Sequence, residues 1–232
     1  MKPVRFALRL QFVEPIRTRS LSYQIFTALS GKVPKQEPES IAERGVQIHV
    51  DKDKMTVLWI PNRCQIALEK ISDIPDVSAK KHYIDRIISV LEIINEVAKI
   101  GKLSNKKLLT YWILPTPQYD FVSLQRKYSE MMFTKNDISN TAYDSSAIFD
   151  IRRDKWDLHH QSGAMEPQQL QEEYLNFKLD SVPKTFIFLE ASLTDNNVLK
   201  YAMDEVCSFM EGALEMCISH MEEFNRICER CL

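Results

Sequence analysis

Hydrophobic and polar residues alternate along the first part of the chain. Over residues 5–13 every even position is apolar, while Arg5, Arg9 and Gln11 occupy odd positions. Successive side chains of a strand point to opposite faces, so this period of two predicts a strand with one buried side. Alternation or short apolar runs predict further strands over residues 46–50, 55–60, 64–68, 108–114, 147–152, 155–160, 174–179 and 185–193.

Other stretches repeat their apolar residues every three or four positions, which is the spacing of one helix face. These stretches predict helices over residues 20–29, 78–100, 121–133 and 165–173. The longest stretch predicts a single helix from Thr194 or Asp195 to Leu232. Its apolar stripe consists of Leu199, Met203, Val206, Met210, Ala213, Cys217, Met221, Phe224, Cys228 and Cys231.

The predicted elements follow the same order in both parts of the chain: a helix, a meander of strands, then a long amphipathic helix. Long helices that cover antiparallel strands define the α+β class. We therefore predict an α+β fold of two similar halves, each an antiparallel strand meander covered by a long amphipathic helix. Pro115 and Pro117, near the midpoint, suggest an N-terminal half over 1–114 and a C-terminal half over 115–232. Residue identities hardly repeat, so the duplication is predicted from pattern alone.

Three stretches carry a resemblance to a known family. They are the strand around Tyr111 and Trp112, the apolar run over 186–189 before the terminal helix, and the helix anchors Tyr83, Ile84, Ile87 and Ile94. In these features the chain resembles a sporadically distributed prokaryotic family of uncharacterised α+β proteins. The likeness covers most of the chain. It implies the architecture of strand meanders and long helices, and it implies no activity.

The composition excludes several common classes of protein. The five glycines are widely spaced, so neither a dinucleotide-binding fingerprint nor a phosphate-binding P-loop is present. A formal net charge of −2 indicates no overall attraction to nucleic acid. No stretch has the apolar length of a signal peptide or a membrane span, so we expect a cytoplasmic protein without a membrane partner. Five cysteines, four of them in the terminal segment, favour reduced thiols over a disulfide framework.

The terminal stripe suggests the leading hypothesis for function, a non-enzymatic protein-interaction module. Its steps average roughly 3.5 residues, which suits packing between helices, including self-association. A helix of roughly 37 residues extends about 55 Å, which is longer than one domain face requires. A homodimer or another protein partner would then contact Met210, Cys217, Met221, Phe224, Cys228 and Cys231. The alternative is that the stripe covers the sheet of its own half.

The same segment contains residue types that bind zinc, namely Cys217, His220, Cys228 and Cys231. Residues 11 positions apart on one continuous helix are separated by roughly 16 Å, whereas zinc ligands lie within roughly 2.3 Å of the metal. We therefore predict no metal site, and no motif in the sequence predicts a cofactor.

A dense polar cluster over residues 150–160 is the strongest candidate for chemistry. On a strand over 155–160, Asp157 and His159 share a face, and a hairpin can bring Asp150 beside them. Carboxylates and an imidazole can bind a divalent metal or act as general acid and base. The alternative function is therefore a metal-dependent hydrolase or nuclease. The competing interpretation is an exposed hairpin face without a catalytic role.

The polar side of the first strand offers a further hypothesis. Arg5 and Arg9 share this side. A sheet face with arginines can hold single-stranded nucleic acid or phosphate, which predicts a nucleic-acid-binding module. The same arginines can instead form ion pairs with nearby acidic residues.

Overall fold

The structure is a computed structural model that describes residues 1–16, 21–30, 46–50, 54–69, 71, 77–133, 145–153, 155–178 and 182–232. Within these residues the strands form one antiparallel sheet. Its order is β2-β3-β4-β1-β5-β8-β7-β6, and the short β9 pairs with β5. The strands are β1 (Lys2–Phe12), β2 (Val46–Val50), β3 (Met55–Ile60), β4 (Arg63–Glu69), β5 (Lys102–Pro115), β6 (Ser146–Arg153), β7 (Trp156–Met165), β8 (Phe186–Asp195) and β9 (Leu199–Lys200).

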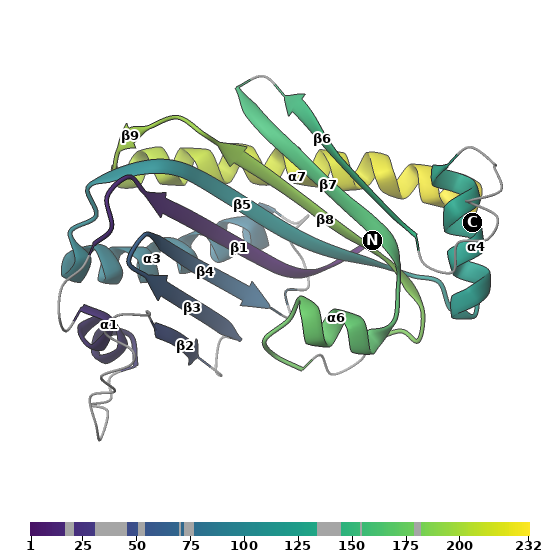
Figure 1. The fold of residues 1–232 in the computed structure, drawn as a ribbon, viewed down its shortest axis with the longest axis horizontal. Coiled ribbons are helices and arrows are strands. Elements are labelled where there is room, and N and C mark those ends of the chain that lie inside the picture. Colours follow the sequence, from purple (N-terminus) through teal and green to yellow (C-terminus); the bar gives the residue numbers. More distant parts are fainter. Residues whose placement is uncertain are drawn as a thin grey trace.

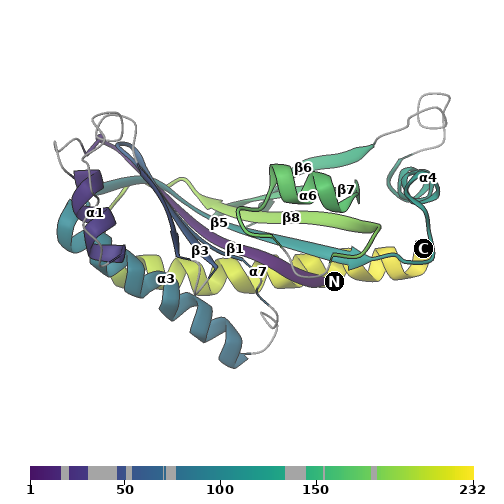
Figure 2. The same cartoon turned by 90° about the horizontal axis from the view of Figure 1, so that it is seen from below.

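Two long helices, α3 (Val77–Ala98) and α7 (Met203–Cys231), lie on the same face of the sheet (Figure 1, Figure 2). α1 (Leu21–Ser30) packs on α3 and β2, and α4 (Phe121–Met132) packs against β7 and α7. The short α6 (Pro167–Glu173) lies on the opposite face (Figure 2). Helices packed on a large antiparallel sheet make this an α+β fold, as the sequence predicts.

One large cluster of buried apolar side chains holds α3 and α7 on the sheet. A leucine, isoleucine, phenylalanine or methionine side chain contributes roughly 1.5–3 kcal/mol to stability when it is fully buried. The cluster contains residues from both halves of the chain, so the halves share one core. Its members include Phe6, Leu8, Leu10 and Phe12 of β1, Ile87, Leu91 and Ile94 of α3, and Met210, Ala213 and Cys217 of α7.

The terminal helix begins later than the sequence predicts. β8 continues through Asp195 and β9 follows, so α7 begins only at Met203. Asp195 lies opposite Lys106 of β5, and the two form a buried ion pair with 3.1 Å between Oδ2 and Nζ. Leu199, which fits the helical spacing, lies exposed in β9. Strand pairing and the ion pair thus override the helical pattern here, and the 29 residues of α7 span about 44 Å.

Gly212 lies at a close contact between α7 and the sheet. A Cβ atom at this position would lie 2.8 Å from Cη2 of Trp156, the first residue of β7. The indole of Trp156 also packs edge-on against Phe209, with 5.6 Å between the ring centroids. The glycine therefore lets the helix backbone lie directly on the indole ring.

Residues 174–178 form no strand, although the sequence predicts one there. This segment follows α6 and is held by the buried side chain of Glu69 at the end of β4. The Glu69 carboxylate accepts hydrogen bonds from the backbone N–H groups of Asn176 and Phe177, at 2.8–3.0 Å. A ladder with another strand would need these same N–H groups, so the side-chain contact replaces strand pairing.

Among the described residues, none of the helices combines the length and the apolar composition that a bilayer-crossing segment requires.

Candidate functional site on the polar face of the sheet

The sheet face opposite α3 and α7, which we call the polar face, carries three neighbouring rows of side chains that follow the strand register. The first row consists of Gln47, Leu58, Gln65, Arg9, Lys107, Thr194, Asp157 and Arg152. The second row consists of His49, Thr56, Ala67, Ala7, Leu109, Ser192, His159 and Asp150. The third row consists of Glu69, Arg5, Tyr111, Glu190, Gln161 and Ile148. The residues predicted for catalysis and those predicted for nucleic-acid binding all lie on this face. The sequence alone does not show that they share it, because they belong to different strands.

The middle of the polar face is buried and largely apolar. Ala7, Ala67 and Leu109 form a buried cluster of their own, and Ser192 beside them is also buried. Ala7, Ala67 and Ser192 are short and leave room for the longer side chains of the two flanking rows. The charged groups of the face therefore stand on either side of a close-packed, largely apolar floor.

Arg5 contacts other groups of its own chain and has a structural role. Its Nη1 lies 3.6 Å from Oε1 of Glu69 and donates a hydrogen bond to the carbonyl oxygen of Tyr174. Its guanidinium also lies over the ring of Tyr111, 5.4 Å from the centroid. With a carboxylate, a carbonyl and an aromatic ring as partners, Arg5 fixes the segment after α6 and is not available to a ligand.

Arg9 of β1 and Arg63 of β4 are diagonal neighbours in the strand register, and neither has a carboxylate partner among the described residues. Nε of Arg9 donates to Oε1 of Gln65 at 2.8 Å, and Nε of Arg63 is buried without a hydrogen-bond partner in the described part of the chain. No carboxylate in that part lies within 4.0 Å of either guanidinium. Burial lowers the pKa of Arg9, and the charge of Arg63 lowers it further. Because arginine stays protonated in proteins, both groups remain charged and repel each other.

Lys107 adds a third cation next to Arg9 in the first row. Its Nζ lies 3.9 Å from Oε1 of Glu190, which is a loose ion pair. Burial lowers the pKa of Lys107, while the charge of Glu190 opposes that effect. Among the described residues, Glu190 is the one carboxylate within 4.0 Å of any of these three cations, so the centre of the polar face has an excess of positive charge.

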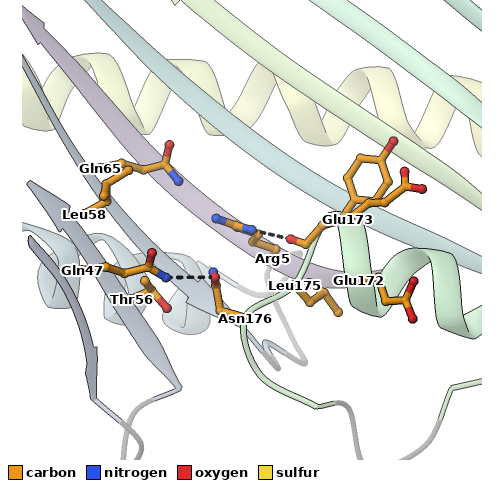
Figure 3. Close-up of a pocket in the computed structure, with 10 residues that line it drawn as sticks. Arg5, Gln47, Thr56, Leu58, Gln65, Glu172, Glu173, Leu175 and Asn176 are labelled. Atoms are coloured by element: carbon orange, nitrogen blue, oxygen red, sulfur yellow. Dashed lines mark hydrogen bonds between the residues drawn. The ribbon is translucent and has the colours of Figure 1, made fainter. Parts of the chain in front are cut away.

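A cavity of about 170 Å³ lies beside Gln65, the hydrogen-bond partner of Arg9 (Figure 3). Strands β1 to β4 form one side of it, and α6 with the segment after it forms the other. Gln47 and Asn176 meet across it, with 3.3 Å between the amide nitrogen and oxygen. The space suits a small polar group and is below the size of typical drug-sized ligand pockets. It is lined by Arg5, Gln47, Thr56, Leu58, Gln65, Glu172, Glu173, Tyr174, Leu175 and Asn176.

The hairpin of β6 and β7 places the three predicted catalytic residues in two separate pairs. Asp150 and His159 face each other, with 2.8 Å between Oδ1 and Nδ1. Asp157 instead pairs with Arg152 and accepts a hydrogen bond from Asn196 at 2.9 Å. Among the described residues, no group of three His, Cys, Asp or Glu side chains is placed to hold a metal ion. The three side chains therefore do not converge on a shared position, and Asp150 is well exposed.

The stripe of α7 faces the sheet of its own chain. Five of the six residues expected to contact a partner, Met210, Cys217, Met221, Phe224 and Cys228, are at most 4% exposed. Only Cys231 among the six is exposed. The prediction of a partner-binding stripe is corrected for these five side chains, because β5 and β8 run beneath the helix and bury them. Burial also raises the pKa values of the Cys217 and Cys228 thiols to about 12.

A buried polar network that sequence analysis does not identify joins β7, α4 and α7. Nδ1 of His160 lies 2.8 Å from Nε2 of His220, and its Nε2 lies 2.5 Å from Oγ of Ser162. The Tyr128 hydroxyl lies 2.8 Å from the same Oγ. A serine next to a histidine is typical of nucleophilic catalysis, but His160 and Ser162 are 0% and 1% exposed. Both side chains are therefore closed to solvent in this conformation, and the network joins the packed surfaces of β7, α4 and α7.

The sequence-based candidates omit Arg63, Gln65 and Lys107 of the polar face. They also omit Asn176, which belongs to the segment after α6 and lines the cavity. A signal existed for two of them. Arg63 and Gln65 alternate with Cys64, Ile66 and Leu68, the predicted inward residues of their strand. Their proximity to Arg9 depends on the pairing of β4 with β1, which local periodicity does not encode.

No protein-family model matches this chain, and no curated protein matches it significantly.

Proposed function

We propose that this chain is a non-enzymatic binding module that holds an oxyanion of its ligand between Arg9 and Arg63 on the polar face. The observation that carries the proposal is the pair of neighbouring guanidinium groups without a carboxylate within 4.0 Å among the described residues. A phosphate or carboxylate placed between them would offset their repulsion and supply the hydrogen-bond acceptors that they lack.

Gln65 connects the cation pair to the cavity. Its side-chain oxygen accepts the hydrogen bond from Arg9, and the same side chain lines the cavity. The amides of Gln47 and Asn176 add further donors and acceptors on the cavity walls. This arrangement supports a small ligand in which an oxyanion lies next to a neutral polar group that enters the cavity.

Tyr111 favours a small anion over single-stranded nucleic acid. Proteins that bind single strands stack bases on exposed aromatic rings. Tyr111 belongs to the third row of the polar face, is 9% exposed and already packs against Arg5, Tyr174 and Phe188. Little of its ring is available for a base, so the support for the nucleic-acid hypothesis is limited to the arginines.

We also propose that the chain contains an internal duplication, and that the cations lie where its two units meet. Among the described elements, the runs β1-α1-β2-β3-β4-α3 and β5-α4-β6-β7-β8-α7 have the same order once α6 and β9 are left out. The strand orders β2-β3-β4-β1 and β6-β7-β8-β5 extend outwards from the central pair β1 and β5. These two observations support a boundary near Gly101, before β5, in place of one after residue 114. Arg9 and Lys107 then lie on the two central strands, one from each unit.

Thermal unfolding in the presence of anions tests the proposal. A ligand that binds only the folded chain raises the unfolding midpoint in a concentration-dependent way. Inorganic phosphate and citrate should raise the midpoint of the wild-type chain. Arg9→Ala and Arg63→Ala should each lose most of that increase. Arg152→Ala is the matched control, because Arg152 lies on the same face and is already paired with Asp157.

A third titration uses a deoxythymidine oligonucleotide, and its binding is measured by fluorescence anisotropy. Salt-sensitive binding of the oligonucleotide that depends on Arg9, without a response to phosphate or citrate, would assign the face to nucleic acid. Equal responses of the wild type and Arg9→Ala to all three probes would overturn the proposal.

A further inference from the structure

We propose that two copies of this chain associate edge to edge through β6, with Ile151 of both copies meeting at a twofold axis. β6 is the last strand of the sheet order and pairs only with β7 among the described strands. In an antiparallel ladder every second residue directs its backbone groups away from the neighbouring strand. The outer edge of β6 therefore carries backbone N–H and C=O groups that can pair with another strand.

The side chains of β6 are unusually exposed for a strand of this sheet. Ile148 is 60% exposed and Phe149 is 37% exposed, so apolar surface lies at this edge together with the backbone groups. Asp150, Arg152 and Arg153 are also exposed. This combination of apolar and charged groups fits a partner strand that offers both apolar surface and complementary charges.

Charge complementarity selects a second copy of β6 as that partner. A twofold axis perpendicular to the sheet keeps the polar faces of both copies on the same side. Residues that then lie opposite each other must share a face, so the positions of each pair sum to an even number. With Ile151 at the axis, Asp150 of each copy lies opposite Arg152 of the other. Centring the pairing on Asp150 or on Arg152 would instead place like charges opposite each other, which destabilises a strand pair.

The same register also gives favourable side-chain pairs on the other face of the strand. Ile151 of one copy meets Ile151 of the other, and Phe149 lies opposite Arg153 of the second copy, where the cation and the ring can interact. On the polar face, each Asp150 already contacts His159 and each Arg152 already contacts Asp157 of its own chain. Pairing of two copies would extend these contacts into continuous rows of alternating charge across the axis.

A charge-exchange experiment on the full chain tests this association by analytical ultracentrifugation. The wild type should form a dimer. Asp150→Arg and Arg152→Asp should each weaken it by at least about tenfold, because each places like charges opposite one another twice. The double variant Asp150→Arg/Arg152→Asp again opposes an arginine to an aspartate across the axis and should recover most of the wild-type affinity. Circular dichroism shows whether each variant is folded.

A cysteine cross-link tests the position of the axis independently of charge. Directly opposite residues of an antiparallel pair bring their Cβ atoms to about 4.5–5.5 Å, close to what a disulfide requires. In a Cys231→Ser background, which removes the exposed native thiol, Ile151→Cys should form a covalent dimer on mild oxidation. Ile148→Cys, on the same strand but away from the axis, should cross-link far less. A monomeric wild type, or a dimer indifferent to the single charge reversals and to the cysteine position, would overturn the proposal.

Discussion

Glu69 accepts hydrogen bonds from both the backbone N–H and the side-chain amide of Asn176, at 2.9–3.0 Å, across 107 residues of sequence. One end of the cavity wall thus depends on a single buried carboxylate of β4. The same carboxylate also lies 3.6 Å from Arg5. The shape of the candidate binding site and the stability of the fold are therefore coupled at this residue.

Replacing Glu69 by glutamine should loosen the wall of the cavity. Glu69→Gln keeps the size of the side chain but removes its charge and one acceptor, which leaves buried donors less well satisfied. We expect a loss of about 1–3 kcal/mol in the free energy of unfolding, measured by urea denaturation. Glu172→Gln, at an exposed carboxylate that lines the same cavity, is the control and should change it by less than about 0.5 kcal/mol. Equal losses in both variants would contradict the anchoring role of Glu69.

Gly212→Ala should destabilise the chain although alanine favours helices. The added methyl group would lie 2.8 Å from the Trp156 ring, and such overpacking costs roughly 1–3 kcal/mol. This cost exceeds the gain of about 1 kcal/mol in helix propensity. Gly101→Ala is the control, because nothing lies within 4 Å of a Cβ atom there. If Gly212→Ala is the more stable of the two in thermal unfolding, the close packing of α7 on Trp156 is wrong.

The pH dependence of stability should report on His160. Burial, with smaller effects from His220 and His159, lowers its pKa from 6.5 to about 3. Between these values the unfolded chain binds a proton that the folded chain excludes. The free energy of unfolding should therefore fall as the pH decreases from about 6.5 towards 3, by up to about 1.4 kcal/mol per pH unit.

Urea denaturation of the wild type and His160→Gln at pH 7.5 and pH 5 measures this effect. The variant should lose part of the pH dependence, and the part that remains includes His220, whose pKa is also lowered by burial. His82→Gln replaces an exposed histidine of α3 and should keep the wild-type pH dependence. An unchanged pH dependence in His160→Gln would show that His160 does not remain neutral in the folded chain.

The buried ion pair of Lys106 and Asp195 should matter far more than an exposed one. Burial alone would raise the pKa of Asp195, but hydrogen bonds from Asn197 and Lys106 outweigh it and lower the pKa. Lys106→Met leaves this carboxylate without its buried cation and should cost about 3–5 kcal/mol. Lys81→Met breaks the exposed pair with Asp85 and should cost at most about 1 kcal/mol. Similar losses in the two variants would contradict the difference in burial.

The sequence predicts the local elements of this fold better than their arrangement. Alternation identifies the buried side of β1, and helical spacing identifies α3 and most of α7, because both signals come from residues that are close in the chain. The start of α7 and the segment after α6 are predicted wrongly. In both places a distant side chain, Lys106 or Glu69, provides the deciding contact.

The candidate site also combines features that local periodicity predicts with features that depend on how the strands are arranged. Periodicity places Arg5 and Arg9 on the polar side of β1, and the pattern of β4 places Arg63 and Gln65 opposite its buried residues. Nothing in the sequence shows that Glu69 engages Arg5 and leaves Arg9 beside Arg63. That distinction requires strand order and register, which are set by contacts between residues more than 50 positions apart.

The central position of β1 has a consequence for how the chain folds. β1 precedes both of its neighbours, β4 and β5, in the chain, and Arg5 pairs with Glu69 and with Tyr111. Closing such long loops costs entropy before the contacts are gained, and sheets dominated by distant pairings fold slowly. During synthesis the apolar side of β1 must wait for about 100 further residues to emerge, which at roughly 5–20 residues per second takes several seconds. A chain with this topology should therefore depend on protection from aggregation while it is being made.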